Sequence, residues 1–337
     1  ANNASRGTAA AKCTLILTEG DSAKSCVMAG LSVVGQDNYG VFPLQGKLLN
    51  VRTASHTQFM NNKEIQNIIK IMGLQVGEKY EDVSELRYGH LMIMTDQDPD
   101  GSHIRGLIVN FIHKYWPSLL KITGFLQVFV TPIMKASTQH KEQIFYTLPE
   151  YATWKSTQQD QGKSWKIKYY KGLGSSTSAE AKEYFNGLEK NKVNLVWTDE
   201  DEDELIDTCF CKKRADDRKS LIMRTDARCS ANFNQESMSI TEFIKKELAA
   251  YFVYDVHRSL PSVIDGLKTT QRKVLYACFE RKKKKIVEDI EVFQLAGYTS
   301  NKTVYRHGIT SLCGTIVGMA QTYVGSNNIN LLTPLGQ

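Results

Sequence analysis

The sequence Leu91-Met92-Ile93-Met94-Thr95-Asp96-Gln97-Asp98-Pro99-Asp100-Gly101 contains the pattern that decides the fold. Its first four residues form a short apolar run, which is typical of a buried β-strand. The acidic residues follow at once, and residues two apart in an extended segment share a face. Asp96, Asp98 and Asp100 are therefore expected to converge where the strand ends.

A second apolar run with an acidic residue behind it lies near the start of the chain. Residues 13–17 read CTLIL, and Glu19 follows within Thr18-Glu19-Gly20-Asp21-Ser22. Ligand sites in open α/β sheets gather at the carboxyl ends of the strands. We therefore expect Glu19 to meet the three aspartates in one crevice.

The segments around these two runs alternate between helical and strand-like patterns. Helices are predicted over 23–31, 63–72 and 103–120, and a further apolar run occupies 125–134. This alternation predicts an α/β domain over residues 12–150, with a mostly parallel sheet flanked by helices.

Four carboxylates in a small volume repel one another unless a cation lies among them. Hard divalent ions prefer oxygen ligands, and Mg²⁺ usually keeps water or a substrate phosphate in its shell. Such a site suits phosphoryl-transfer chemistry. An EF-hand calcium loop is excluded, because its twelfth position, counted from Asp96, is Leu107 instead of a glutamate. Simple turn chemistry, in which Asp, Pro and Gly are common, stays open as a structural alternative.

Length and composition indicate a soluble chain with room for two domains. The chain has 337 residues, of which 42% are apolar, and a domain has roughly 150 residues. No apolar run approaches the ~18 residues of a membrane span. Residues 1–11 are small and polar, so we expect a disordered lead-in and no secretory signal. Seven scattered cysteines favour reduced thiols inside the cell over a disulfide scaffold.

The second half of the chain divides into an irregular part and a helical part. Residues 151–235 are interpreted as an insert or linker, in which the acidic run Asp199–Glu204 is expected to be an exposed loop. From residue 236 onward the patterns are helical. Helices are predicted there over 240–250, 267–281 and 308–324.

Positive charge is concentrated in the helical part. Between His257 and Lys285, nine Lys or Arg residues stand against two acids, a balance of 9 − 2 = +7, whereas the whole chain carries +6. Lys268, Arg272 and Lys273 are spaced i, i+4 and i+5, so they are expected on one helix face. Such a segment suits a helix-turn-helix or winged-helix module that binds DNA. A solvated helix face is the alternative.

These residues resemble the Toprim domain of the type IIA DNA topoisomerases, through Glu19-Gly20-Asp21-Ser22-Ala23 and the motif at 96–101. Further segments look like the eukaryotic-type enzymes and follow in family order: Tyr39-Gly40-Val41-Phe42-Pro43-Leu44, Gly46-Lys47-Leu48-Leu49-Asn50-Val51, Tyr169-Tyr170-Lys171-Gly172-Leu173-Gly174, Asp265-Gly266-Leu267-Lys268, Gln271-Arg272-Lys273-Val274-Leu275 and Val324-Gly325-Ser326-Asn327-Asn328. The resemblance covers nearly the whole chain. It implies a Toprim domain followed over 236–337 by the start of a winged-helix domain.

The resemblance implies the cleavage–religation region of an ATP-dependent enzyme that changes DNA topology through a transient double-strand break. In such an enzyme a tyrosine attacks a DNA phosphate, and the 3′-hydroxyl later reverses the link. The family places this tyrosine after the motif at 324–328, so we expect a fragment that holds the metal half of the site. Tyrosines present here are expected to pack in the core instead: Tyr276, Tyr298, Tyr305 and Tyr323.

The resemblance also assigns roles to single residues. Glu19, Asp96 and Asp98 are the implied Mg²⁺ ligands and catalytic residues, and Asp100 holds a second ion or supports the first. His307 is expected near the scissile phosphate and counts as catalytic. The implied DNA contacts, which position a duplex without reading its sequence, are Lys47, Asn50, Arg258, Lys268, Arg272, Lys273 and His307.

The implied cofactor is Mg²⁺, in a site with room for two ions and open to Mn²⁺ or Ca²⁺, and ATP belongs only to the full-length enzyme. The implied partners are double-stranded DNA and a second copy of the full-length chain, with no membrane. The nucleus is the expected compartment, and a mitochondrial or viral-factory setting is the alternative.

Gln45, Thr53 and Ile309 depart from the family pattern, which puts individual DNA contacts and drug response in doubt. Another Toprim nuclease or primase, or a non-catalytic DNA-binding module, are the alternative functions.

Overall fold

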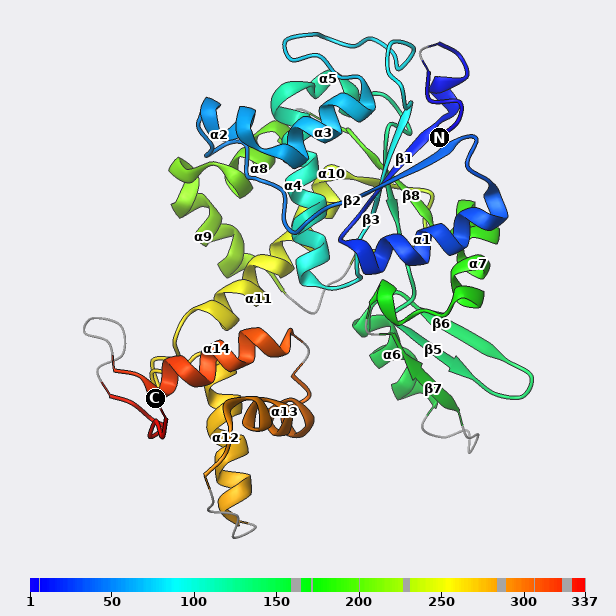
Figure 1. Cartoon of the computed structure of the whole chain (residues 1–337). Helices are drawn as coiled ribbons and strands as arrows, with labels where there is room; N and C mark the ends of the chain where they lie inside the picture. Colours follow the sequence, from blue (N-terminus) through cyan, green and yellow to red (C-terminus); the bar gives the residue numbers. More distant parts are fainter. Residues whose placement is uncertain are drawn as a thin grey trace. The chain divides into compact units, whose positions relative to one another are not determined.

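The structure is a computed structural model that describes residues 1–5, 7–158, 165–170, 172–199, 201–226, 231–283, 289–305, 307–322 and 329–336, without the side chains of Ser22 and Ser175. It divides into two compact units, Ala1–Val253 and Tyr254–Gln337 (Figure 1). The motif at 324–328, together with Lys171 and Tyr323, lies outside the described residues.

A six-stranded sheet forms the centre of the first unit, in the order β2 (Tyr39–Pro43), β1 (Thr14–Thr18), β3 (His90–Met94), β4 (Leu126–Phe129), β8 (Lys192–Val196) and β9 (Ser237–Ser239). The first four strands are parallel, β8 is antiparallel to β4, and β9 is parallel to β8. The two apolar runs of the sequence form β1 and β3, so the predicted α/β fold with a mostly parallel sheet is confirmed.

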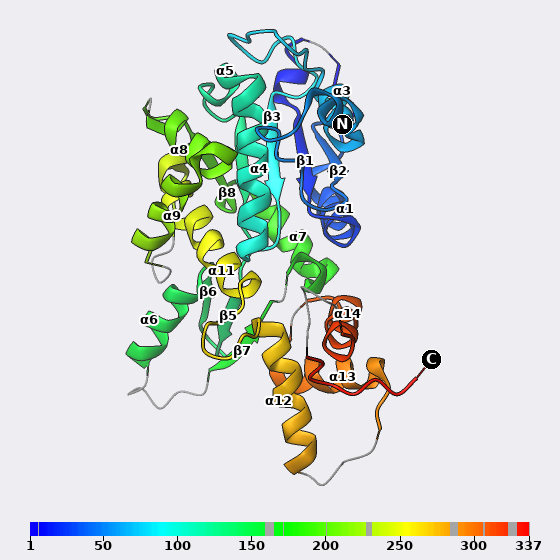
Figure 2. The same ribbon diagram turned by 90° about the vertical axis from the view of Figure 1, so that its left-hand side faces the viewer.

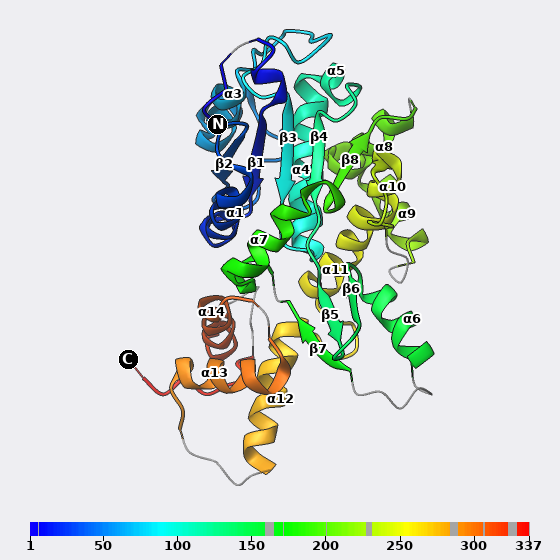
Figure 3. The same ribbon diagram turned by 90° about the vertical axis from the view of Figure 1, so that its right-hand side faces the viewer.

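Helices cover both faces of this sheet (Figures 2 and 3). One face carries α1 (Asp21–Val34) and α7 (Ser178–Asn186), and the other carries α3 (Lys63–Met72) and α4 (Pro99–Tyr115). Successive side chains along each strand point to opposite faces of the sheet, as expected of a strand buried on both sides. Ile16 and Met92 belong to the core under α1, whereas Leu15 and Leu91 belong to the core under α4.

The helix predicted over 103–120 is two helices, α4 and the short α5 (Pro117–Leu120). α4 begins earlier than predicted, because Asp98 caps it and Pro99 suits the first helical position. Pro117 has no N–H to donate and disfavours helical geometry at the residue before it. Trp116 accordingly has φ −143° and ψ 61°, and the helix ends there. A further short helix, α2 (His56–Asn61), precedes α3.

The first residues of the chain are ordered, although residues 1–11 were expected to be a disordered lead-in. The N–H of Asn2 donates to Gln36 O at 3.0 Å, and the N–H of Asn3 donates to Asp37 O at 2.9 Å. Ala4 is buried, and η1 (Ala10–Lys12) forms a 3-10 turn. The prediction was wrong because small residues anchor this segment through backbone hydrogen bonds, which composition does not reveal.

A small antiparallel sheet is inserted after β4. Its strands, in spatial order, are β6 (Glu142–Phe145), β5 (Met134–Ser137) and β7 (Lys166–Tyr169). Helix α6 (Leu148–Gln158) lies between β6 and β7 in the chain, and the 3-10 turns η2 (Leu173–Ser175) and η3 (Leu188–Lys190) come after β7. The chain then returns to the main sheet as β8. The segment interpreted as an insert, 151–235, therefore also supplies α7 and β8 to the main α/β layers.

The acidic run Asp199–Glu204 is not the exposed loop that was expected. It leads into α8 (Asp201–Phe210), which is followed by η4 (Lys212–Arg214) and α9 (Ala215–Arg224). Glu202 is fully buried, and its carboxylate accepts hydrogen bonds from the N–H and hydroxyl of Thr198 at 3.1 and 3.0 Å. Acidic residues in a first turn also complement the helix dipole. Residues 201–204 of the run therefore start a helix instead of forming a loop.

The first unit extends beyond residue 236, the start expected for the DNA-binding domain. The chain continues there as α10 (Ile240–Phe243), the π-helical turn η5 (Ile244–Leu248) and α11 (Ala249–Ser259). Ile240, Phe243 and Leu248 are buried in the core under α4. Because these side chains complete that core, the division between the units falls at Val253, within α11.

The second unit is helical in its described part, as predicted. It contains α12 (Thr269–Lys283), α13 (Val292–Thr303) and α14 (Ile309–Ala320). Val274, Leu295 and Leu312 form its small core. Across the described residues of both units, no helix has the length and apolar character needed to span a membrane.

Candidate metal centre and DNA-binding residues

The ends of β1 and β3 bring Glu19 and Asp96 together. Thr18 pairs with Met94 in parallel register, so the chain leaves both strands at the same edge of the sheet. The N–H of Asp96 donates to Glu19 Oε2 at 3.1 Å. The structure thus joins two acidic residues that lie 77 positions apart in the sequence.

The other two aspartates belong to the start of α4. Asp98 Oδ1 accepts the N–H of Gly101 at 2.8 Å and so caps the helix, while Asp100 lies in its first turn. A Cβ at Gly101 would collide with the carbonyl oxygen of Asp96. Glycine at this position therefore lets the acidic loop fold tightly against its helix.

Burial and neighbouring negative charges oppose the ionisation of Glu19 and Asp96. The pKa of Glu19 is raised to about 7, first by burial and then by the charges of Asp96, Asp98 and Asp100. Burial also raises the pKa of Asp96, although a hydrogen bond from the Leu173 N–H favours its ionised form. Among the residues that the structure describes, no group of three or more His, Cys, Asp or Glu side chains is arranged to hold a metal ion.

A turn from the inserted segment completes the surroundings of Asp96. The N–H of Leu173 donates to Asp96 Oδ1 at 2.7 Å. Gly172 has φ +129°, and a Cβ there would collide with the Asp96 carboxylate. The sequence singled out this glycine-rich motif without assigning it a role. Only the fold shows that this motif packs against the acidic loop and donates a hydrogen bond to Asp96.

Lys47 and Asp100 are partners in this structure. Lys47 Nζ lies 2.6 Å from Asp100 Oδ1 and 4.8 Å from the ring centroid of Tyr251. The resemblance had assigned Lys47 to DNA and Asp100 to a metal ion. Since the two side chains are exposed only in part, at 36% and 22%, the ion pair lies at the accessible rim of the acidic site.

Asn50 is engaged in a polar network inside the protein. Its Nδ2 donates to the carbonyl of Phe210 in α8 at 2.9 Å. Its Oδ1 accepts hydrogen bonds from the Arg52 N–H and the Asn110 side chain, both at 3.1 Å. These bonds let Asn50 join α4 to α8, and its assignment as a DNA contact stays a prediction.

Two of the predicted DNA contacts lie on α12 with different neighbours. Arg272 donates to both oxygens of Asp265 at 2.7 and 2.8 Å, whereas Lys273 lies 6.0 Å from the ring centroid of Tyr305. Lys268 precedes the helix, and its carbonyl accepts the Arg272 N–H at 3.0 Å. Lys268 therefore lies just before the helix, which starts two residues later than predicted, whereas Arg272 and Lys273 lie on it.

Arg258 and His307 share a tyrosine. Arg258 pairs with Asp255 Oδ1 at 3.0 Å and lies 5.0 Å from the ring centroid of Tyr254. Nε2 of His307 is 3.3 Å from the hydroxyl oxygen of the same tyrosine. The imidazole of His307 is exposed, so it is accessible to a ligand such as DNA.

Three family models match the chain in succession. The Toprim domain matches residues 14–131, the C-terminal associated domain of TOPRIM matches 129–256, and the DNA gyrase/topoisomerase IV A-subunit family matches 258–337. The last two matches meet close to the division between the compact units at Val253.

Several curated proteins are similar over almost the whole chain. The probable DNA topoisomerase 2 of Dictyostelium discoideum is 53% identical over 99% of this chain. DNA topoisomerase 2 of Plasmodium falciparum is 53% identical, and DNA topoisomerase 2-alpha of Rattus norvegicus is 52% identical, each over 97%. The chain spans 22%, 23% and 22% of these three relatives.

A solved structure leads to the same assignment. The DNA-binding, cleavage and re-ligation domain of Plasmodium falciparum topoisomerase II superposes with a TM-score of 0.85 at 52% identity, covering 97% of this chain and 44% of that one. The chain thus combines a Toprim fold with a following segment of the gyrase A type. More narrowly, it belongs to the eukaryotic DNA topoisomerase 2 family.

Proposed function

We propose that this chain is the DNA cleavage–religation region of an ATP-dependent type IIA topoisomerase, and that its first unit holds the metal ion used in the reaction. The observation that carries the proposal is the acidic site at the edge of the sheet, where Glu19 meets Asp96 and has a raised pKa. Perturbed carboxylates gathered at strand ends favour a functional site over simple turn chemistry.

The donor set of this site fits Mg²⁺. Glu19, Asp96 and Asp98 would hold one ion, with Asp100 supporting it or holding a second, and Mn²⁺ or Ca²⁺ could replace it. Each of the first three carboxylates uses one oxygen for the described hydrogen bonds, and within the described residues the other oxygen has no such bond. These side chains have to turn toward a common point on binding. A bound ion would supply charge stabilisation at the scissile phosphate.

The remaining basic residues would position the DNA backbone. We assign phosphate contacts to Lys47 in the first unit and to Lys268, Arg272, Lys273 and Arg258 in the second. Arg272 and Arg258 would exchange their aspartate partners for phosphate oxygens, a replacement that keeps each guanidinium paired with an anion. His307 would lie near the scissile phosphate, with Tyr254 orienting its ring.

The full-length protein would contribute what this region does not carry. In this proposal the nucleophilic tyrosine and the ATP site belong to other segments, and the working enzyme is a homodimer on double-stranded DNA. The nucleus is the compartment that suits this activity, as inferred from the eukaryotic relatives, with a mitochondrial or viral-factory setting as the alternative.

A substitution at Asp98 tests the metal site. Asn keeps the helix cap, because Asn and Asp are similarly good at this position, but it removes the charge. We expect Asp98→Asn in the full-length enzyme to lower Mg²⁺-dependent DNA cleavage at least about a hundredfold, or about 2.7 kcal/mol. DNA affinity, measured by fluorescence anisotropy, should change less than about twofold because phosphate contacts dominate it.

The matched control is Glu204→Gln, at an exposed acid of α8 that pairs with Arg214 at the surface. It should leave cleavage unchanged. Cleavage by Asp98→Asn at the unmodified rate would contradict the proposed metal site. Loss of folding in this variant would instead support a purely structural loop.

A further inference from the structure

Arg105 is a buried cation directly behind the acidic loop. Its side chain is fully buried, Nε donates to Thr95 Oγ1 at 3.0 Å, and Nη2 donates to Asp96 O at 3.3 Å and Gln97 Oε1 at 2.6 Å. Side chains of a helix lean toward its N-terminus, so a residue in the second turn of α4 reaches the loop before the helix. One guanidinium thus bonds all three residues between β3 and the helix cap.

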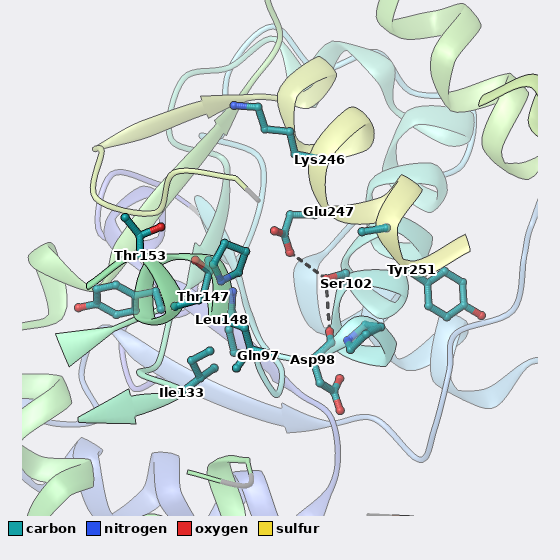
Figure 4. A pocket seen from close by; sticks show the side chains of 15 residues that line it. Gln97, Asp98, Ser102, Ile133, Thr147, Leu148, Thr153, Lys246, Glu247 and Tyr251 are labelled. Carbon is teal, nitrogen blue, oxygen red and sulfur yellow. Dashed lines mark hydrogen bonds between the residues drawn. The ribbon is translucent and has the colours of Figure 1, made fainter. Parts of the chain in front are cut away.

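Glu247 provides the nearest counter-charge to Arg105. Its Oε2 lies 4.0 Å from Arg105 Nη1 and accepts a hydrogen bond from the Ser102 hydroxyl at 3.0 Å. The same hydroxyl is 3.3 Å from the carbonyl oxygen of Asp98, as Figure 4 shows for Glu247, Ser102 and Asp98. A buried cation without a nearby anion would be strongly destabilising. Glu247 therefore makes the burial of Arg105 tolerable.

The position of Glu247 depends on an unusual element. It lies in the π-helical turn η5, between Ile244 and Leu248, which are both buried in the core. A π-turn widens the helix by one residue and is often found at functional sites. In this turn the apolar residues fill the core while the acidic residue between them faces Ser102 and Arg105.

We propose that Arg105 and Glu247 form a positioning pair for the metal-binding loop. Arg105 holds the loop 95–97 by its backbone and side chains, and Glu247 holds Arg105 from the segment that follows the Toprim domain. Neither residue ligates the ion. The inference rests on the proposed metal site at Glu19, Asp96 and Asp98.

Removing Arg105 should change metal affinity in one direction if the side chain holds the loop, and in the opposite direction if it acts only through its charge. A fixed cation close to a metal site repels the incoming ion, so its removal would tighten metal binding if Arg105 acted only through its charge. If Arg105 acts by holding the loop, its removal releases the carboxylates and weakens binding. The sign of the change therefore separates the two roles.

The experiment is a titration of the full-length protein with Mn²⁺, without nucleotide or DNA, in which free Mn²⁺ is measured by electron paramagnetic resonance. We expect Arg105→Met to raise the dissociation constant about tenfold, within the range typical of residues that orient metal ligands. Arg105→Lys keeps the charge and some of the hydrogen bonds, so it should recover most of the affinity. Unchanged or tighter binding by Arg105→Met would overturn the proposal.

Glu247→Gln provides the second test. It keeps the hydrogen bond from Ser102 and removes the charge, so it should weaken Mn²⁺ binding. The double variant with Arg105→Met should bind Mn²⁺ little more weakly than Arg105→Met alone, because the two residues act as a unit. If Arg105→Met does not fold, the Mn²⁺ affinity of Glu247→Gln tests the proposal by itself. Wild-type affinity in Glu247→Gln would then contradict the proposed positioning pair.

Two controls separate the possible failures. Arg218 donates to the carbonyls of Thr208 and Cys211 at 2.9 Å, away from the acidic loop, so Arg218→Met should lower the melting temperature and leave Mn²⁺ affinity unchanged. Asp98→Asn should abolish tight binding. Tight Mn²⁺ binding by Asp98→Asn would contradict the proposed metal site itself. If Asp98→Asn loses tight Mn²⁺ binding while Arg105→Met keeps it, only the positioning pair is contradicted.

Discussion

Glu19 is a carboxylate whose surroundings oppose its charge. Its pKa in the folded protein is about 7, above the ordinary value of a glutamate, because of burial and the neighbouring aspartates. Between the ordinary value and about 7, the native state binds more protons than the unfolded state, so the free energy of unfolding falls as pH rises. An ion that binds among these carboxylates would remove this penalty.

The neutral substitution Glu19→Gln tests this effect in metal-free protein. We expect it to increase the free energy of unfolding at pH 8 by about 1 kcal/mol, a value that allows for solvent screening. The gain should shrink toward pH 5, where the glutamate is protonated in the native state. Urea unfolding in chelator at both pH values measures it. An equal difference at both pH values would mean that ionisation of Glu19 is not the cause.

The sequence was informative about residues whose role depends on local spacing. Glu19 and Asp96 follow apolar strands, and strand pairing brings such positions to one edge. Arg105 and Glu247 gave no comparable signal, because their pairing depends on how a helix and a distant π-turn pack. The contact of Lys47 with Asp100 was missed for the same reason, since the sequence assigned each of them to a separate ligand.

At the level of elements, α8 shows how an acidic run can stabilise a helix. Glu202 is buried and accepts hydrogen bonds from Thr198 and from the N–H of Thr241 at the start of α10. Glu202→Ala would leave these donors unsatisfied and should lower the free energy of unfolding by about 1–3 kcal/mol. Glu204→Ala, at an exposed position of the same turn, should change it by less than about 0.5 kcal/mol. Urea unfolding compares the two, and equal effects would contradict the buried role of Glu202.

Elements with strong apolar periodicity were predicted well from the sequence. α3 has the predicted bounds, and β1 and β3 lie within a residue of the predicted runs. Errors arose where local chemistry was not visible as periodicity. Pro117 divided a predicted helix, and the residues before η1 were ordered by backbone hydrogen bonds.

At the scale of the whole molecule, the two compact units divide the proposed tasks. The first unit carries the acidic site, and the second carries most of the basic residues proposed to contact DNA, in agreement with the division between the matched families. The sequence placed this boundary near residue 236 because helical patterns begin there. The structure places it at Val253, because the intervening apolar residues belong to the core of the first unit.

In the proposed site, the acidic residues at the ends of the neighbouring strands β1 and β3 share one divalent ion. Anomalous diffraction from crystals of the protein with a DNA duplex and Mn²⁺ tests it most directly. We expect a manganese peak ligated by Glu19, Asp96 and Asp98 beside a DNA phosphate. At saturating Mn²⁺, a peak held by other residues, or no peak among these three carboxylates, would contradict the claim.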